Sequence, residues 1–413
     1  MGQTVSVSEG GELRLTPAQR QRWGVAPGVE FWAEETPDGV VLRRKDPVLR
    51  KVYVEPTAAC NLSCRTCVRH SWDEPAGTMT METYQRLMEG LYEVNSLRTV
   101  AFWGFGEPLM HPRIVEMVAM AKDLGATTEV VTNGLLLDER TARGLVDAGL
   151  DTLVVSLDGA SPEAFADVRS GADLRLVREN VAGLRAIRGD NGHGPEIGIS
   201  FVAMRRNVAE LPHLRHLAST LGATFVVVSN VLPYTEELKD EILYGLWAGP
   251  SYHGRRSTWA PEIRLPRMDL RPDTAEPIVS LLRHDGLAPA TPPQVGIAGG
   301  YCRFVSEGSA AVSWNGELSP CIALMHSYRC YVMRREKRIR RYSVGNVRER
   351  SIANIWQDDA YVAFRDRVRR FDFAPCTDCG GCDMAESNEE DCIGNTFPVC
   401  GDCLWAKGVI QCP

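Results

Sequence analysis

The sequence lacks any uninterrupted apolar run long enough to span a bilayer, so we expect no membrane-spanning segment. Its first residues, MGQTVSVSEGGELRL, lack the basic and apolar regions of a secretion signal. A strong charge excess is also missing, because the formal net charge is −7, and neither a nucleic-acid nor a membrane surface is indicated. These absences predict a cytoplasmic globular protein, and 413 residues suggest two or three domains.

Cysteine is absent between Cys67 and Cys302, although the chain has 13 cysteines in all. Three of them are Cys60, Cys64 and Cys67, and the other ten follow from Cys302 onward. Thiols stay reduced in the cytosol, so this density indicates metal binding rather than disulfide bonds. The distribution predicts one metal site near the start of one domain and further sites in a C-terminal module.

Residues 50–232 alternate between strand-like and helix-like segments. The strand-like segments are RKVYVEP, RTVAFWG, TTEVVTN, DTLVVSLD, EIGISFVAM and TFVVVSNV. Among the helices between them, one follows the capping residue Thr80 and a long one opens at Ser161 and Pro162. Repeated units of this kind predict an α/β fold with a parallel sheet, and six units form only a partial barrel. Ligands bind such sheets at the carboxyl ends of the strands.

Cys60, Cys64 and Cys67 follow the first of these strands with the spacing C-x3-C-x2-C. Three thiolates are one short of the four that usually hold a 4Fe–4S cluster, so one iron would stay open to an outside ligand. A structural zinc ion would need a fourth protein ligand, which His70 could supply. Zinc therefore remains an alternative on the local spacing.

With this motif, residues 50–232 resemble the radical S-adenosylmethionine (SAM) superfamily. The resemblance implies a partial (β/α)6 barrel in which Cys60, Cys64 and Cys67 hold a 4Fe–4S cluster. It also implies that the amino and carboxylate groups of SAM bind the open iron. An electron from the cluster would then cleave SAM to methionine and a 5′-deoxyadenosyl radical.

Further motifs at successive strand ends would form the SAM pocket in this resemblance. A Gly-x-Gly-Glu-Pro loop would contact the methionine amino group, later residues would bind the ribose, and the last two would contact adenine and the methionine carboxylate. In chain order, these residues are Gly104, Gly106, Glu107, Pro108, Asn133, Ser156, Asp158, Met204 and Arg205. Each motif also makes turns unaided, so their shared placement carries the prediction. The family usually has an aromatic residue where this chain has Thr66, which puts adenine packing there in doubt; Trp72 or Phe105 could compensate.

The C-terminal cysteines begin with Cys302, followed by Gly316-x4-Cys321, which resembles the start of a SPASM auxiliary-cluster domain. The later spacing departs from the usual SPASM pattern. The predicted ligands of one or two auxiliary 4Fe–4S clusters are Cys302, Cys321, Cys376, Cys379, Cys382, Cys392, Cys400, Cys403 and Cys412. We expect Cys330 to be a free thiol. A zinc ribbon of Cys376 and Cys379 with the Cys400 and Cys403 pair is the alternative.

Two segments, CNLSCRTCVRHSWDEP and DCIGNTFPVCGDCLWAKGVIQCP, resemble the radical maturases associated with tungsten-containing aldehyde oxidoreductases. This resemblance implies action on the pterin–metal cofactor or on the oxidoreductase itself. Within the same class, the alternative is modification of a ribosomal peptide or a sulfatase-type protein. An electron donor such as ferredoxin or flavodoxin would be a partner.

Residues 1–48 contain short strand patterns around Gly-Gly and Asp-Gly turns and resemble the AbrB-like swapped-hairpin barrel, a family that commonly binds DNA as a dimer. We expect a small all-β module for homodimerisation or partner docking, followed by a radical SAM barrel over 49–233. A connector or substrate-facing insertion would cover 234–300 and the SPASM-like domain 301–413. A metal-containing DNA-binding regulator is the alternative from another class, although the acidic charge and the six β–α units argue against it.

Overall fold

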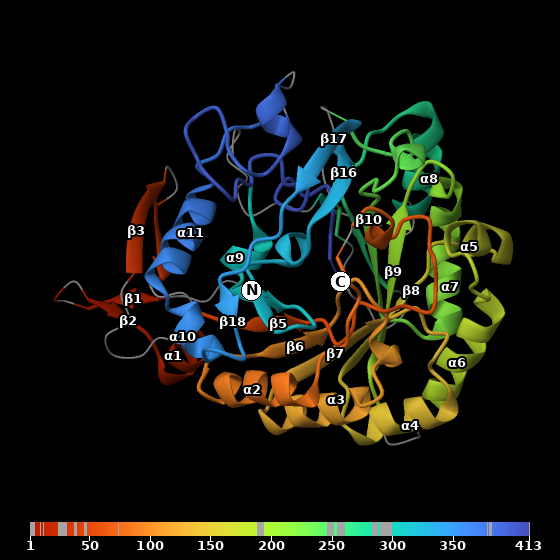
Figure 1. Ribbon diagram of the computed structural model, residues 1–413, viewed down its shortest axis with the longest axis horizontal. Coiled ribbons are helices and arrows are strands. Elements are labelled where there is room, and N and C mark those ends of the chain that lie inside the picture. Colours follow the sequence, from red (N-terminus) through yellow and green to blue (C-terminus); the bar gives the residue numbers. More distant parts are fainter. Residues whose placement is uncertain are drawn as a thin grey trace. The chain divides into compact units, whose positions relative to one another are not determined.

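The structure is a computed structural model of the chain, shown in Figure 1. It describes residues 5–8, 10, 12–23, 31–36, 39–44, 48–72, 74–187, 194–245, 252–253, 261–282, 288–289, 300–377, 379 and 382–412. The chain divides into two compact units, Met1–Leu49 and Arg50–Pro413. Within the described ranges, no helix is both long enough and apolar enough to cross a membrane.

The first unit contains short strands and one helix. Strands β1 (Ser6–Val7) and β2 (Leu13–Arg14) pair antiparallel, as do β3 (Phe31–Thr36) and β4 (Gly39–Arg44). Helix α1 (Pro17–Trp23) starts after Thr16, whose hydroxyl accepts a hydrogen bond from Gln19 N while the Gln19 side chain accepts one from Thr16 N. This reciprocal cap explains why the helix starts at the predicted place. The predicted turn at Pro37 and Asp38 lies outside the described residues, and the AbrB-like resemblance stays a prediction.

The second unit is built on a parallel sheet, which confirms the predicted fold class. Six neighbouring parallel strands follow chain order, because each is joined to the next by a crossover. Their interior positions are almost continuously buried, as expected for a sheet covered on both faces. These strands are β5 (Lys51–Val54), β6 (Thr99–Phe102), β7 (Thr127–Thr132), β8 (Thr152–Ser156), β9 (Glu196–Ala203) and β10 (Phe225–Asn230).

Helices between these strands cover the outer side of the sheet (Figure 1). They are α2 (Met81–Tyr92), α3 (Ile114–Asp123), α4 (Glu139–Asp147), α5 (Pro162–Val168), α6 (Leu174–Ile187) and α7 (Leu214–Leu221). Thr80 and Ser161 cap α2 and α5 as predicted, each accepting a hydrogen bond from the first turn. The long helix predicted after Ser161 is instead two helices. Gly171 between them has φ +87°, a left-handed conformation that interrupts a helix and favours glycine.

Both edges of the sheet are extended by segments that the sequence analysis assigned to other modules. Strand β14 (Ser309–Val312) pairs parallel with β5, and β15 (Glu317–Ser319) and β18 (Gly345–Asn346) continue antiparallel beyond it. At the other edge, β12 (Glu262–Leu265) pairs parallel with β10, followed by β11 (Tyr252–His253) and β13 (Ala288–Pro289). The described part of the chain thus forms one twelve-stranded sheet. The proposed domain boundaries at 233 and 300 stay predictions.

A hairpin, four helices and several 3₁₀ turns complete the described part of the second unit. Strands β16 (Tyr328–Val332) and β17 (Arg335–Ile339) form a hairpin whose two turn residues, Met333 and Arg334, have positive φ angles, as a two-residue type I′ turn requires. Tyr331 N of this hairpin donates a hydrogen bond to the Pro233 carbonyl. The other helices are α8 (Pro272–Leu282), α9 (Arg303–Ser306), α10 (Ile352–Trp356) and α11 (Asp359–Arg370). The 3₁₀ turns are η1 (Val68–His70), η2 (Pro108–Met110), η3 (Val208–His213), η4 (Glu236–Leu238), η5 (Ile322–Leu324) and η6 (Asp383–Glu386).

The chain segment 404–412 returns to the barrel. Asn230, at the end of β10, donates hydrogen bonds to the carbonyls of Val409 and Arg267, and Gln411 N donates one to Ser229 Oγ. The segment 404–412 therefore contributes to the cavity at the strand ends.

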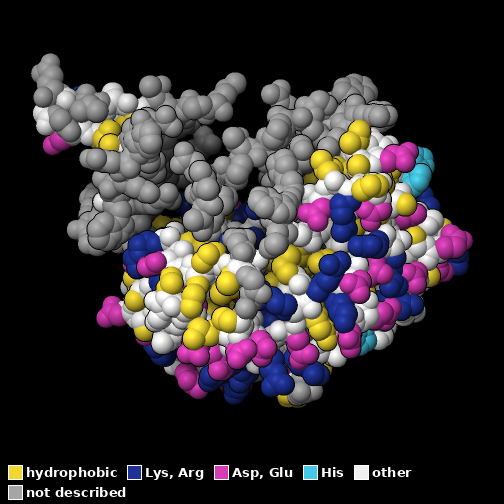
Figure 2. Space-filling model, turned by 90° about the horizontal axis from the view of Figure 1, so that it is seen from above, with side chains coloured by type: hydrophobic (Ala, Val, Ile, Leu, Met, Phe, Trp, Pro, Cys, Tyr) yellow, Lys and Arg dark blue, Asp and Glu magenta, His cyan; other side chains and the backbone are white. Residues whose placement is uncertain are grey.

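On the described part of the face in Figure 2, basic and acidic side chains are interspersed rather than gathered into a field of one sign.

Candidate functional site

A cavity opens at the carboxyl ends of strands β5 to β10, where a ligand of a parallel sheet is expected. Its empty volume, including the open mouth, is about 1190 Å³. The predicted site residues that line it are Cys60, Cys64, Cys67, Gly104, Gly106, Glu107, Asn133 and Ser156. Four others, Pro108, Asp158, Met204 and Arg205, lie outside the lining.

The three cysteines at the cavity mouth are free thiols, each partly buried. Burial raises the pKa of Cys60, and it raises that of Cys64 to about 11 despite the nearby guanidinium of Arg169. Cys67 Sγ accepts a hydrogen bond from Arg69 Nε at 3.2 Å. A bound metal centre would displace the thiol protons and stabilise the thiolate forms. Three soft donors at a cavity mouth fit an iron–sulfur cluster.

His70, the candidate fourth ligand for zinc, lies on the solvent side of this loop. Its Nε2 donates to the carbonyl oxygen of Cys64 at 2.9 Å. Within the described ranges, no three His, Cys, Asp or Glu side chains converge on a point where a single metal ion could bind. Zinc at this motif stays an alternative prediction.

The loop of residues 104–108 is held close to the cysteine loop. A Cβ on Gly106 would lie 2.0 Å from the Thr57 carbonyl oxygen, and Glu107 N donates to the Ala59 carbonyl. The Glu107 carboxylate is buried, which raises its pKa, and it accepts hydrogen bonds from Thr132 Oγ1 and Asn133 N at 2.7 Å each. Glycine is therefore required by backbone packing, and Glu107 joins the end of β6 to the end of β7.

Asn133 and Ser156 line the cavity, whereas Asp158 acts behind it. Asp158 is fully buried, accepts a hydrogen bond from Val202 N, and forms an ion pair with Arg169 at 2.9 Å. Arg169 follows α5 and lines the cavity beside the cysteines. Arg169 was not predicted from the sequence, because one arginine in a helix-like segment carries no local signal of burial. The available clue was its acidic partner Asp158, which follows the neighbouring strand β8.

Met204 and Arg205 lie outside the lining of the cavity. Met204 is buried in a hydrophobic cluster, and Arg205 is exposed, with its backbone N donating to the Glu241 carbonyl. Their functional roles stay predictions. The next residue, Arg206, forms ion pairs with Asp167, Glu237 and Glu241 at 2.9–3.3 Å.

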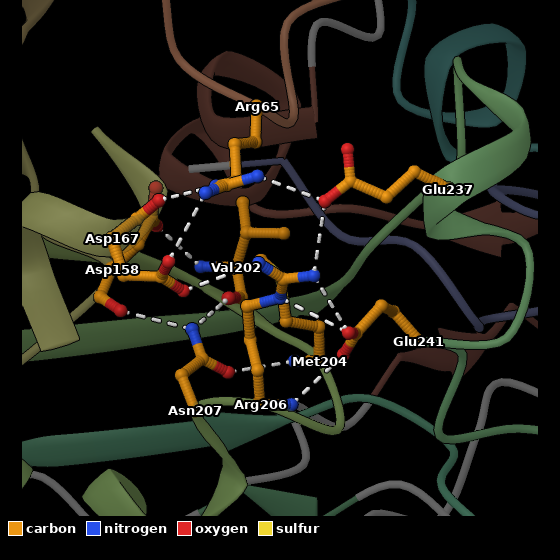
Figure 3. Close-up of polar contacts among 9 residues, drawn as sticks. All are labelled: Arg65, Asp158, Asp167, Val202, Met204, Arg206, Asn207, Glu237 and Glu241. Atoms are coloured by element: carbon orange, nitrogen blue, oxygen red, sulfur yellow. Dashed lines mark hydrogen bonds and ion pairs between the residues drawn. The ribbon is translucent and has the colours of Figure 1, made fainter. Parts of the chain in front are cut away.

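Figure 3 shows that Arg65, beside Cys64, shares two of these carboxylates with Arg206. Arg65 forms ion pairs with Glu237 at 2.8 Å and with Asp167 at 3.4 Å. The network thus connects the cysteine loop to the end of α5, to the turn after β9 and to η4. Its partly exposed members limit each pair to a small stabilisation, but together they restrict the loop.

Aromatic side chains lie near the Thr66 position that departs from the family pattern. Thr66 and Phe105 both line the cavity, and Trp72 packs edge-to-face on Phe105 with ring centroids 5.7 Å apart. Phe105 therefore offers an aromatic surface in the cavity, with Trp72 behind it. Whether either packs against adenine stays a prediction.

A second cavity, of about 760 Å³ empty volume, is lined by four of the predicted auxiliary ligands: Cys302, Cys321, Cys400 and Cys403. Burial raises the pKa of all four thiols, that of Cys302 to about 12. Four thiols around one apolar space match the complement of a 4Fe–4S cluster. Cys330 also lines this cavity and is buried.

The remaining cysteines lie apart from that group. Cys379, Cys382 and Cys392 are exposed and Cys376 is half-buried. Cys412 instead lines the cavity at the strand ends, where its sulfur accepts a hydrogen bond from Trp405 Nε1 at 3.2 Å. The second cavity thus brings Cys400 and Cys403 together with Cys302 and Cys321. The zinc-ribbon alternative would instead combine Cys400 and Cys403 with Cys376 and Cys379.

Comparisons with known proteins agree with this arrangement. The family model of the radical SAM superfamily matches residues 54–206, and that of SPASM, an iron–sulfur cluster-binding domain, matches residues 302–383. The chain is 32% identical over 370 residues to the tungsten-containing aldehyde ferredoxin oxidoreductase cofactor-modifying protein of Pyrococcus furiosus, covering 88% of this chain and 97% of that protein.

More distant matches extend over most of the chain. A PqqA peptide cyclase of Granulibacter bethesdensis is 26% identical, covering 85% of this chain and 84% of the cyclase. The crystal structure of SuiB from Streptococcus suis bound to S-adenosylmethionine has a TM-score of 0.56 and 17% identity, covering 82% of this chain and 72% of SuiB. That structure shows the same fold.

Proposed function

The chain belongs to the radical SAM superfamily and carries a SPASM domain, and from that membership we propose that it matures the cofactor or the protein of a tungsten-containing aldehyde oxidoreductase. It is an iron–sulfur enzyme that uses SAM. The observation that carries the substrate proposal is the 32% identity, over 97% of the relative's length, to a protein named as the cofactor-modifying protein of a tungsten-containing aldehyde ferredoxin oxidoreductase.

In this proposal, Cys60, Cys64 and Cys67 hold the SAM-cleaving cluster. The bound cluster supplies the electron that splits SAM into methionine and a 5′-deoxyadenosyl radical, which abstracts a hydrogen atom from the substrate. The chain's own contribution is a cavity that orients the nucleotide and excludes water. Gly106 and Glu107 keep the 104–108 loop against the cysteine loop, so that its backbone groups face the cavity.

Arg169 is the side chain we propose to bind the carboxylate of SAM. A buried guanidinium beside the cysteines is expensive to desolvate, and a carboxylate ligand would compensate part of that cost through charge-assisted hydrogen bonds. Asp158 orients Arg169 from behind the cavity wall. Asn133 and Ser156 offer hydrogen-bonding groups for the ribose hydroxyls.

The proposal is tested by anaerobic reconstitution with iron and sulfide, reduction, and assay of 5′-deoxyadenosine formed from SAM. The wild-type protein should form it, and Cys64→Ala should lose it while keeping the iron of its auxiliary clusters. That residual iron is the internal control for folding. Cleavage by Cys64→Ala at the wild-type rate would disprove the site assignment.

The substrate is tested separately, because the first assay contains none. Adding a tungsten oxidoreductase isolated without its maturase, or its pterin cofactor, should raise 5′-deoxyadenosine formation above the uncoupled rate. A rise with a ribosomal precursor peptide instead would favour the second candidate, peptide modification. The similarity to a PqqA peptide cyclase across 84% of that enzyme is the observation that keeps this candidate in view.

Two partners complete the proposal: a ferredoxin or flavodoxin as electron donor, and a second copy of the chain contacted through residues 1–48. The separate compactness of Met1–Leu49 supports testing it by deletion. A dimer that becomes monomeric in light scattering after deletion of residues 1–48 would support the second partner, and an unchanged mass would contradict it.

Family membership favours this enzyme over a metal-containing DNA-binding regulator.

A further inference from the structure

A buried histidine between two carboxylates lies beside the cavity, outside its lining. His326 Nε2 is 2.8 Å from Glu55 Oε2, and its Nδ1 is 2.8 Å from Glu74 Oε2. The Glu55 side chain is 0% exposed, that of His326 4% and that of Glu74 21%. Since carboxylates only accept hydrogen bonds when ionised, this geometry makes His326 a donor on both sides.

The three residues come from parts of the chain that are far apart in sequence. Glu55 directly follows β5, Glu74 lies in the loop after the cysteine motif, and His326 follows η5, close after Cys321. A further bond strengthens this connection, because Ser327 N donates to Glu74 Oε1 at 2.7 Å. The triad therefore joins the SPASM region to both sides of the cysteine loop.

Glu55 carries this connection to the 104–108 loop. Its Oε1 accepts a hydrogen bond from Phe105 N at 3.0 Å. A Cβ on Gly104 would lie 2.4 Å from Glu55 Cγ, so glycine is needed there to admit the Glu55 side chain. Phe105 lines the cavity, whereas Glu55 and His326 do not. The carboxylate thus acts on the cavity through the loop backbone.

The positive charge of His326 offsets the free-energy cost of burying the Glu55 carboxylate. Burial alone would lower the pKa of His326, but the hydrogen bonds and charges of Glu55 and Glu74 outweigh it and raise that pKa to about 9. The imidazolium stays protonated at neutral pH and compensates the buried charge of Glu55. Its ring also packs on Trp72, with centroids 4.4 Å apart.

We propose that His326 is a positioning residue for SAM: through Glu55 it fixes the 104–108 loop, so that SAM affinity depends on a side chain from the SPASM region. This inference rests on the proposed function, because it takes the cavity to be the SAM site. Without the imidazolium, the Glu55 carboxylate would be buried without a cation and would move. Phe105 N would then lose its acceptor, and the loop would lose its fixed position.

The main test replaces His326 with Phe, which keeps a ring against Trp72 but removes both donors. The KM for SAM in 5′-deoxyadenosine formation should rise about tenfold or more, because a buried acceptor has lost its partner. The kcat at saturating SAM and the iron content should stay within about twofold. The dissociation constant of SAM, from the change in the electron paramagnetic resonance signal of the reduced cluster, should rise in parallel.

Two further variants keep the test valid if His326→Phe does not fold. His326→Gln retains one donor and should raise the KM by less, about threefold. In Glu55→Gln, the amide accepts from Phe105 N and can donate to a neutral ring nitrogen of His326, so the KM should remain near that of the wild type. Glu55→Ala, which removes the acceptor, should behave like His326→Phe.

Thr274→Val is the matched control for destabilisation. Its hydroxyl is buried at the start of α8, donates to the Asp269 carbonyl at 2.5 Å and lies outside the cavity. It should lower the melting temperature without changing the KM for SAM.

Unchanged KM and dissociation constant in His326→Gln and Glu55→Ala would overturn the inference, as would a parallel fall of kcat, iron content and melting temperature at constant KM. A wild-type protein that neither binds nor cleaves SAM would refute the proposed function, and this inference with it.

Discussion

At the scale of single residues, Arg169 carries the most specific role that the sequence did not predict. Arg169→Gln should raise the KM for SAM about tenfold to a hundredfold, since a charge-assisted pair to the SAM carboxylate is lost. The KM of Arg169→Lys should lie between that of the wild type and that of Arg169→Gln, because lysine keeps the positive charge but lacks the planar guanidinium group. The measurement is 5′-deoxyadenosine formation against SAM concentration.

The control for this change is Arg175→Gln, on the exposed surface of α6. Arg175 pairs with Glu179 at 2.8 Å, and both side chains are more than half exposed. Its loss should leave the KM for SAM and the melting temperature almost unchanged. Equal KM values for Arg169→Gln and Arg175→Gln would contradict the role given to Arg169.

The titration of His326 predicts a pH dependence of stability. Its pKa is raised from 6.5 to about 9 in the folded protein, so its stabilising effect is fully present below about pH 6.5 and is lost as the pH rises through about 9. At about 1.4 kcal/mol per unit, this amounts to roughly 3 kcal/mol. Melting temperatures of the wild type should therefore fall more steeply between pH 6.5 and 9 than those of His326→Gln. Parallel curves would contradict the prediction.

Residue types and spacing predicted the cavity well where the chemistry is local. The C-x3-C-x2-C motif, Gly106 and Glu107 lie where the strand-end argument put them. Asp158 was placed in the pocket, but the structure puts it behind Arg169. Arg169 follows Asp158 after the single helix α5, but the sequence does not show that their side chains meet, because that depends on how the two loops pack.

At the scale of elements, the 104–108 loop and the cysteine loop fit together through backbone atoms. Gly106→Ala should lower the melting temperature and abolish most 5′-deoxyadenosine formation, because its Cβ would meet the Thr57 and Ala59 carbonyl oxygens at 2.0 and 2.6 Å. Neither oxygen can turn away as the end of a flexible side chain could. Iron content and activity after reconstitution measure the effect.

Gly183→Ala is the comparison, in the exposed part of α6. A Cβ there meets no atom within 4 Å, so the change should be neutral or stabilising by up to about 1 kcal/mol. A similar loss of activity in both variants would show that general instability, not the close approach of the loops, explains the Gly106 result.

Elements whose hydrophobic residues repeat with a clear period were predicted, whereas elements only a few residues long were not. Helix α2 begins after Thr80 as expected, since its cap and amphipathic pattern lie in one stretch of sequence. The four residues of β14 are small and buried, and they show no alternation that marks a strand. Gly171 splits one predicted helix in two, and a single glycine is a weak signal inside a helical pattern.

At the scale of the second unit, the segment 404–412 is part of the barrel. Ile410, Gln411 and Cys412 line the cavity, and Gln411 is bonded to β10 and to the Leu265 carbonyl of β12. Ending the chain after Gly408 should weaken SAM binding at least tenfold, because the cavity loses part of its wall. Equilibrium binding of SAM to the reconstituted protein checks this, and wild-type affinity would contradict it.

The arrangement of the whole second unit could be predicted only in part. Repeated β–α units predict a parallel sheet, and that sheet is observed. The pairing of β14 with β5 could not be foreseen, because nothing near either strand specifies a partner more than 250 residues away. Strands β11 to β13 at one edge, and β14, β15 and β18 at the other, therefore extend the sheet beyond the six strands that the pattern predicted.

That pairing also has a consequence for how the protein is made. While the ribosome is still translating the barrel, β5 has β6 on one side and bare N–H and C=O groups on the other, until residues 309–312 emerge. An uncovered strand edge invites pairing with other nascent chains, and late-closing contacts slow folding. Productive expression should thus improve with slower synthesis or added chaperones, before any cluster is inserted.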